Sequence, residues 1–138
     1  MQEPSAVLLK SEILHNAGFS HAFFTRQGGV SQGPYESLSF SSAAGDSVDN
    51  VAQNLELAAA ALGVTVPHIY FLSQVHGRDV VVVDGSEARS ELIERRGDGV
   101  LSRTPGVACG VRSADCVPVL LADRRSRAVA ALHAGWRG

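Results

Sequence analysis

The pattern of apolar and polar residues divides the last quarter of the chain into two short strands. Residues 117–122 (VPVLLA) and 128–134 (AVAALHA) are apolar runs, and the polar link at residues 123–127 (DRRSR) is short enough for a hairpin turn. We therefore expect an antiparallel pair. In such a pair Cys116, just before the first run, lies close to His133, near the end of the second.

The one clear helical pattern lies at residues 48–62. Its apolar residues follow the helical period, at positions 48, 51, 55, 58, 59 and 62. Asp46 or Ser47 is suited to cap the start of this helix. Asn50 and Asn54 lie one turn apart on the same side, and we expect both to face solvent.

Further apolar segments predict a sheet. Residues 69–77 (IYFLSQVHG) are expected to form one strand, in which Leu72, Gln74 and His76 share a face. Residues 78–84 (RDVVVVD) are a nearly continuous β-branched run, which is typical of a strand buried on both faces. The other expected elements are short strands at residues 6–9, 21–25, 98–101 and 107–111 and a short surface helix at residues 85–97. About seven strands and one good helix predict an α+β fold dominated by sheet.

Composition narrows the class of protein. The chain has 138 residues, which suits one domain, and 45% of them are hydrophobic, which is enough for a core. Twelve basic against 14 acidic residues give no general attraction to nucleic acid or to an anionic membrane. No apolar run approaches the ~20 residues of a membrane span, and the start lacks a basic signal-peptide region. Two cysteines make no disulfide framework. These features predict a cytoplasmic protein with free thiols.

The candidate chemistry lies at the ends of the expected strands. His76, Cys116 and His133 each stand at the edge of a strand-like run, and together they allow two kinds of site. They can bind zinc, with a fourth coordination position left for a water whose pKa falls to about 7. Alternatively, Cys116 is a nucleophile and a histidine is its base, without a metal.

Two carboxylates and one arginine accompany these residues. Asp115, directly before Cys116, is a candidate for orienting a metal ligand, and both it and Asp98 are candidate acids or bases. Arg26 heads a loop rich in glycine and is a candidate anion ligand, although its spacing alone favours a solvated loop arginine. Cys109 lies within an apolar run and is expected to be a small core residue. The remaining histidines, expected to be structural or solvated, are His15, His21 and His68.

Several segments resemble the YfiH-like family, whose members carry the names laccase, polyphenol oxidase or zinc-dependent purine nucleoside phosphorylase. The strongest are SQVHG, SADCVPVLLAD and HAGWRG. The segment TRQGGVSQGPYESL resembles the family's upstream loop, and GDSVDNVAQN its helix-opening segment. The resemblance is spread over residues 23–138, which makes it specific.

This resemblance implies a function as well as a fold. It implies a zinc site of His76, Cys116 and His133, with phosphate held by Arg26. It also implies phosphorolysis of adenosine, inosine or methylthioadenosine, and deamination of adenosine. The implied fold is a layered α/β sandwich with a mixed, largely antiparallel sheet, related to the cysteine hydrolases of the cytotoxic necrotizing factor toxins. Members are also discussed as amidases that edit peptidoglycan precursors. A copper polyphenol oxidase is a weaker reading, because the chain has no His-x-His motif.

Three features depart from the family pattern. Ser39 stands where asparagine is usual and Leu55 where arginine is usual, and both changes are expected to weaken substrate or anion binding. The chain also stops after HAGWRG, near the midpoint of the family pattern. We therefore expect residues 1–138 to be a single domain truncated on its C-terminal side, poorly stable alone and prone to self-association through exposed sheet. An inactive binding remnant is a further alternative.

Overall fold

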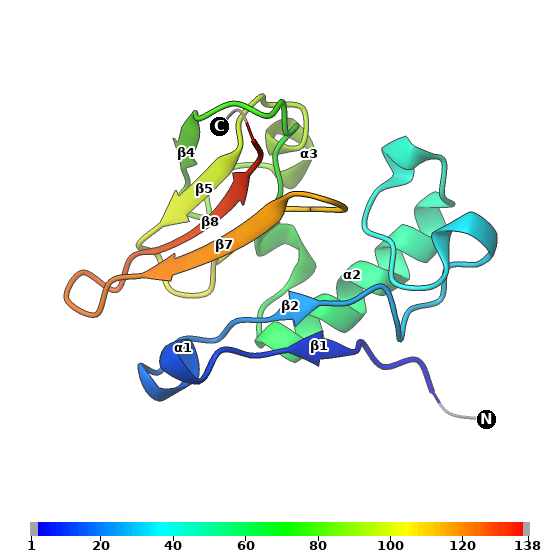
Figure 1. Cartoon of the computed structure of the whole chain (residues 1–138), viewed down its shortest axis with the longest axis horizontal. Helices are drawn as coiled ribbons and strands as arrows, with labels where there is room; N and C mark the ends of the chain where they lie inside the picture. Colours follow the sequence, from blue (N-terminus) through cyan, green and yellow to red (C-terminus); the bar gives the residue numbers. More distant parts are fainter. Residues whose placement is uncertain (1–2, 137–138) are drawn as a thin grey trace. The chain divides into compact units, whose positions relative to one another are not determined.

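The computed structural model describes residues 3–136, which divide into two compact units between Val66 and Pro67. Each unit is described by itself below, with the element labels of Figure 1. Arg137 and Gly138, the last two residues of the HAGWRG segment, lie outside the described residues. Within the described part of the chain, no helix is both long and apolar enough to cross a membrane.

The first unit is organised around one long helix. Its regular elements are β1 (Leu8–Leu9), α1 (Glu12–Asn16), β2 (Phe23–Phe24) and α2 (Val48–Leu62), with 3-10 turns at Gly33–Tyr35 and Ser42–Ala44. Strands β1 and β2 pair antiparallel. Helix α2 has the predicted bounds. The Ser47 hydroxyl caps it by accepting from the Asn50 N–H at 3.4 Å, and Gly63 ends it in the left-handed region.

Asn54 is buried, so the expectation that it faces solvent is wrong. Its side chain is fully buried and makes three hydrogen bonds. Its Oδ1 accepts from the Val30 N–H at 2.9 Å, and its Nδ2 donates to the Ser31 hydroxyl at 2.9 Å and to the Ser39 carbonyl at 2.8 Å. Asn54 therefore holds the loop of residues 26–47 against the helix, and these bonds offset the cost of burying its amide.

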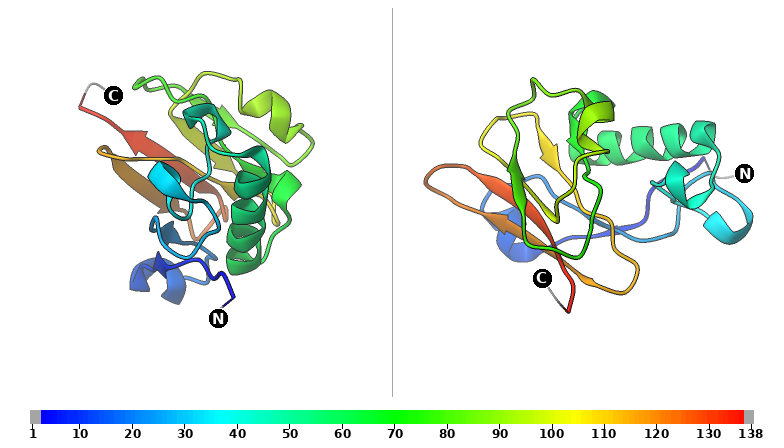
Figure 2. Two further views of the ribbon diagram at one scale, coloured as in Figure 1. Left: turned by 90° about the vertical axis from the view of Figure 1, so that its right-hand side faces the viewer. Right: turned by 90° about the horizontal axis from the view of Figure 1, so that it is seen from above.

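The second unit contains a four-stranded sheet with the order β4-β5-β8-β7 (Figure 1). Its strands are β4 (Val80–Val82), β5 (Gly99–Ser102), β7 (Val117–Ala122) and β8 (Val129–Ala134). Strands β4 and β5 run parallel and the other neighbours antiparallel, so the sheet is mixed and largely antiparallel, as predicted. The views in Figure 2 show β7 and β8 as the predicted hairpin.

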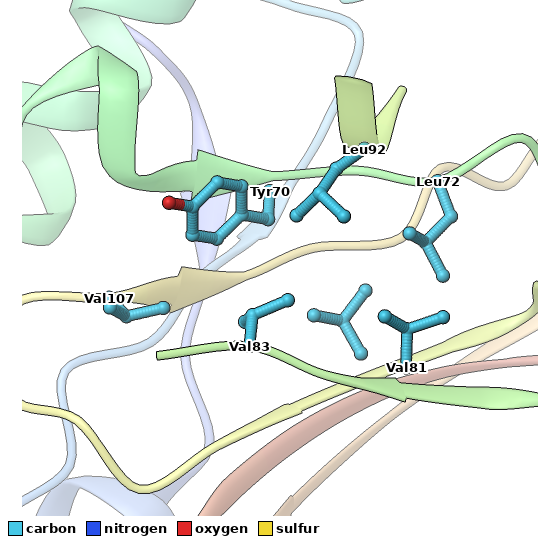
Figure 3. Close-up of a cluster of buried hydrophobic side chains, with 7 residues drawn as sticks. Tyr70, Leu72, Val81, Val83, Leu92 and Val107 are labelled. Carbon is cyan, nitrogen blue, oxygen red and sulfur yellow. The ribbon is translucent and has the colours of Figure 1, made fainter. Parts of the chain in front are cut away.

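Four shorter elements complete this unit. They are a 3-10 turn at Val66–His68, which begins at the boundary, a parallel pair of β3 (Ile69–Tyr70) with β6 (Ala108–Cys109), and helix α3 (Arg89–Leu92). The helix lies within the segment where a short surface helix was expected. The core includes Tyr70, Leu72, Val81, Val83, Leu92, Val100 and Val107, six of which are labelled in Figure 3.

Two strand predictions in this unit are wrong. The strand expected at residues 69–77 ends at Tyr70, and the chain then turns, with His76 at a positive φ of 59°. The run at residues 78–84 is not buried on both faces, because Val80 and Val82 are 48% and 68% exposed. Strand β4 lies at an edge of the sheet, where one face packs on the core and the other faces outward.

Candidate metal centre

Three side chains from separate segments of the second unit meet at one point. The ligand atoms of His76, Cys116 and His133 all lie within 4.8 Å of one another. Cys116 directly precedes β7, and His133 lies on β8 opposite Pro118, so the hairpin register brings the thiol and this imidazole together. His76 comes from the turn that follows β3.

Asp98 holds two of these segments in place. Its carboxylate accepts hydrogen bonds from the backbone N–H groups of Val75, His76 and Gly77 at 3.0, 2.9 and 2.9 Å. The same carboxylate lies 2.8 Å from Nδ1 of His133. Its backbone carbonyl also accepts from the His133 N–H at 2.8 Å. One buried residue therefore fixes both the turn that carries His76 and the ring of His133.

These contacts determine which atoms of Asp98 and His133 carry protons. Burial by itself raises the pKa of Asp98, but the hydrogen bonds from His133 and from the backbone of Gly77, Val75 and His76 outweigh it and hold the pKa below its ordinary value. An ionised carboxylate only accepts hydrogen bonds, so Nδ1 of His133 carries the proton that it donates. Nε2 of a neutral His133 then keeps its lone pair for a ligand.

The site is buried on one side and open on the other. His133 is 6% exposed, Cys116 is half-buried and His76 is exposed. The rings of His76 and His133 pack edge to face, with 5.1 Å between their centroids. Gly135 lies against the centre, since a Cβ there would be 3.3 Å from Cδ2 of His76 and 3.6 Å from Sγ of Cys116. A residue without a side chain therefore lets the ligands approach.

The two carboxylate candidates are separated by the structure. Asp98 contacts His133, whereas Asp115 is exposed. Sequence alone could not rank them, because the contact of Asp98 depends on the pairing of β5 with β8. Cys109 packs against the core, as expected, and burial raises the pKa of its thiol to about 12.

Arg26 does not belong to the unit that holds the three ligands. It lies in the first unit, where its side chain is exposed and its Nη1 donates to the Glu36 carbonyl at 3.4 Å. Its own carbonyl accepts from the N–H groups of Ser37 and Leu38, both at 2.7 Å, which fixes the backbone of the loop. The structure thus brings together His76, Cys116 and His133, whereas Arg26 belongs to the other unit.

His21 is a structural residue, as expected from its sequence context. Its ring is buried, with Nε2 accepting from the Ser11 N–H at 2.7 Å and Nδ1 lying 3.0 Å from the Phe19 carbonyl. Both ring nitrogens are therefore engaged with the backbone of the first unit. His21 has no ring nitrogen left for a metal.

Known proteins are similar to this chain in sequence and in fold. Residues 20–138 match the family model described as multi-copper polyphenol oxidoreductase laccase. Purine nucleoside phosphorylase YfiH of Escherichia coli K12 is 44% identical over 114 residues, which are 83% of this chain and 45% of that protein. Purine nucleoside phosphorylase of Deinococcus radiodurans is 39% identical over 138 residues, covering 100% of this chain and 51% of that one.

A solved structure has a fold similar to that of this chain. The crystal structure of the hypothetical protein YfiH from Bacillus licheniformis superposes with a TM-score of 0.85 at 27% identity, covering 98% of this chain and 51% of that one. The chain spans about half the length of the relatives it matches. Because the family model covers most of the sequence, this chain belongs to the multi-copper polyphenol oxidoreductase laccase family, and it is similar in sequence and fold to YfiH proteins.

Proposed function

We propose that this chain carries the zinc centre of a purine nucleoside phosphorylase that also deaminates adenosine. The observation that carries the proposal is the convergence of the His76, Cys116 and His133 ligand atoms within 4.8 Å. Two imidazoles and a thiol suit zinc, and three protein ligands leave one coordination position open, as in catalytic zinc sites. When bound, zinc would acidify a coordinated water and polarise a substrate group.

The names of the relatives support the substrate class. Relatives at 39% and 44% identity are named purine nucleoside phosphorylases. In phosphorolysis, a phosphate oxygen bonds to C1′ of the ribose while the bond from C1′ to the purine nitrogen breaks, which yields ribose 1-phosphate and the free base. In deamination, water replaces the amino group at C6 of adenosine, which yields inosine and ammonia. Adenosine, inosine and methylthioadenosine are the proposed substrates.

The residues of the chain have separate parts in this proposal. Asp98 keeps a proton on Nδ1 of His133, so that Nε2 serves as a ligand. The exposed side of the site, at His76, is where a nucleoside would enter. Cys116 would bind as a thiolate.

Arg26 is the proposed phosphate ligand. Its guanidinium is exposed and, among the described residues, donates only to the Glu36 carbonyl. A guanidinium offers five N–H groups, and paired N–H groups match the oxygens of phosphate. Leu55, which replaces the family's usual arginine, is 4% exposed, so that position contributes no second charge here.

A metal-free cysteine hydrolase is the second candidate. In this candidate Cys116 would be the nucleophile, His133 its base and Asp98 the carboxylate that orients the base, with 2.8 Å between Nδ1 of His133 and Oδ2 of Asp98. Such a site would act on an amide, as in the editing of peptidoglycan precursors. The same residues serve both candidates, so metal dependence separates them.

The test compares wild type with Cys116→Ala, and uses Cys109→Ala as the matched control. We expect wild type to convert adenosine and phosphate to ribose 1-phosphate, to lose this activity when a chelator is added and to recover it with zinc. Cys116→Ala should be inactive and Cys109→Ala active. Amide hydrolysis that resists chelation but needs Cys116 would favour the second candidate. Zinc binding without any turnover of adenosine would make the chain a binding remnant.

A further inference from the structure

The side chain of Gln74 makes two hydrogen bonds to the backbone of one residue in a neighbouring segment. Its Oε1 accepts from the Arg112 N–H at 2.7 Å, and its Nε2 donates to the Arg112 carbonyl at 2.5 Å. Gln74 lies two residues before His76, and Arg112 lies four residues before Cys116. These bonds therefore connect the segment that carries one imidazole to the segment that carries the thiol.

These bonds extend the pairing of β3 with β6 beyond the ends of the two strands, through side chains in place of backbone groups. Beyond the parallel pair β3–β6, the Gly110 N–H still donates to the Tyr70 carbonyl at 2.9 Å. Nη2 of Arg112 then donates to the Leu72 carbonyl at 3.0 Å. A side-chain amide has a donor and an acceptor, as a peptide group does, so the amide of Gln74 acts as the next partner in the row.

Residues 110–116 depend on such contacts for their position. They contain no helix or strand. They are also held by a bond from the Ser113 hydroxyl to the Cys116 carbonyl and by the packing of the Arg112 guanidinium 5.3 Å from the Phe71 ring centroid. A segment with few backbone hydrogen bonds opens easily unless side chains hold it.

Different contacts connect the three ligands in pairs. The β7–β8 ladder sets Cys116 relative to His133, and Asp98 links His133 to the turn of His76. Gln74 adds a direct link for the remaining pair, His76 and Cys116, because it connects the two segments that carry them.

We infer that Gln74 is a positioning residue of the metal centre, which holds Cys116 at binding distance from His76; this inference rests on the zinc function proposed above. Without it, residues 110–116 would have to be ordered when the metal binds. That ordering costs conformational entropy, which lowers affinity. Partners that orient metal ligands typically change metal affinity by about 10- to 100-fold when they are lost.

The test uses Gln74→Met, which keeps the length of the side chain and removes both hydrogen-bonding groups. Tyr70→Phe is the matched control, because it removes one hydrogen bond of the same unit, to the Glu87 carbonyl at 2.8 Å, and leaves the ligands untouched. Cobalt(II) is the probe, and titration of the metal-free 138-residue chain gives both affinity and the thiolate-to-cobalt charge-transfer band. Thermal melting without metal reports stability for all variants.

We expect Gln74→Met to bind cobalt about 10-fold or more weakly, with a weaker thiolate band, while Tyr70→Phe matches wild type. Gln74→Glu keeps an acceptor for the Arg112 N–H and should fall between them, which preserves the test if Gln74→Met does not fold. Equal affinities and spectra for Gln74→Met and Tyr70→Phe would overturn the assignment. No cobalt binding by wild type would overturn the metal centre itself, and the assignment with it.

Discussion

Replacing Asp98 with asparagine tests how the centre is held together. The carboxylate accepts four N–H groups, two at each oxygen: Val75 and Gly77 at Oδ1, and the His76 backbone and the His133 ring at Oδ2. An amide has one oxygen, so in either orientation two of the four donors face an NH₂ group. If the NH₂ group of the new asparagine faces His133, Nδ1 of His133 can accept a hydrogen bond from it only after the ring proton moves to Nε2, which is the proposed ligand atom.

The magnitude follows from these contacts. A hydrogen bond to a charged group contributes about 1.5–3 kcal/mol, so the loss of two should lower the free energy of unfolding by about 3–6 kcal/mol. Zinc affinity should fall by about 10- to 100-fold, because the ring of His133 loses its fixed tautomer. The first quantity is measured by urea unfolding with chelator present, and the second by competition with a chromophoric chelator.

Asp123→Asn is the matched control for this substitution. The Asp123 carboxylate accepts three hydrogen bonds, from the N–H groups of Arg125 and Ser126 and from the Ser126 hydroxyl, but it lies in the exposed β7–β8 turn. It should leave zinc affinity unchanged. If Asp98→Asn bound zinc as tightly as wild type, the proposed role of Asp98 in orienting His133 would be refuted, whatever its effect on stability.

Three further predictions use other parts of the chain. Folding lowers the pKa of Asp98, so the ionised carboxylate contributes its full stabilisation above the ordinary pKa of 3.8, and this contribution is lost as the pH falls through the lower folded-state pKa. The difference in free energy of unfolding between wild type and Asp98→Asn should therefore shrink below about pH 4 in urea titrations, and a difference that stays constant would contradict this. Burial raises the pKa of Cys109 to about 12, so at pH 8 iodoacetamide should alkylate Cys116 and not Cys109 in the folded metal-free chain, with zinc protecting Cys116, as read by mass spectrometry. Asn54→Ala should lower the free energy of unfolding by about 3 kcal/mol through three lost hydrogen bonds, whereas Asn50→Ala, one turn away, should change it little; equal effects would contradict the structure.

Local patterns predicted the parts of the fold that depend on local physics. The helix at residues 48–62 and the hairpin of residues 117–122 with 128–134 have the expected types and pairing, because apolar periodicity and a short polar turn determine them. The hairpin also explains why Cys116 and His133 could be placed together from sequence.

Predictions that depended on distant partners failed. Asn54 faces a loop 15 to 24 residues away, and no helical pattern reveals such a partner. Val80 and Val82 are exposed because β4 is an edge strand, and strand order is a tertiary property. The sequence could not distinguish the roles of Asp98 and Asp115 for the same reason, because the contact of Asp98 with His133 joins residues that are 35 positions apart.

The measurement that tests the central claim most directly is the metal content of the chain purified without chelators. The account predicts about one zinc ion per chain in wild type, the same in Cys109→Ala, and a large loss in Cys116→Ala and His133→Ala. Elemental analysis of the four proteins, each shown by circular dichroism to be folded, decides the matter. Zinc absent from wild type, or retained equally in Cys116→Ala, would contradict a metal centre formed by His76, Cys116 and His133.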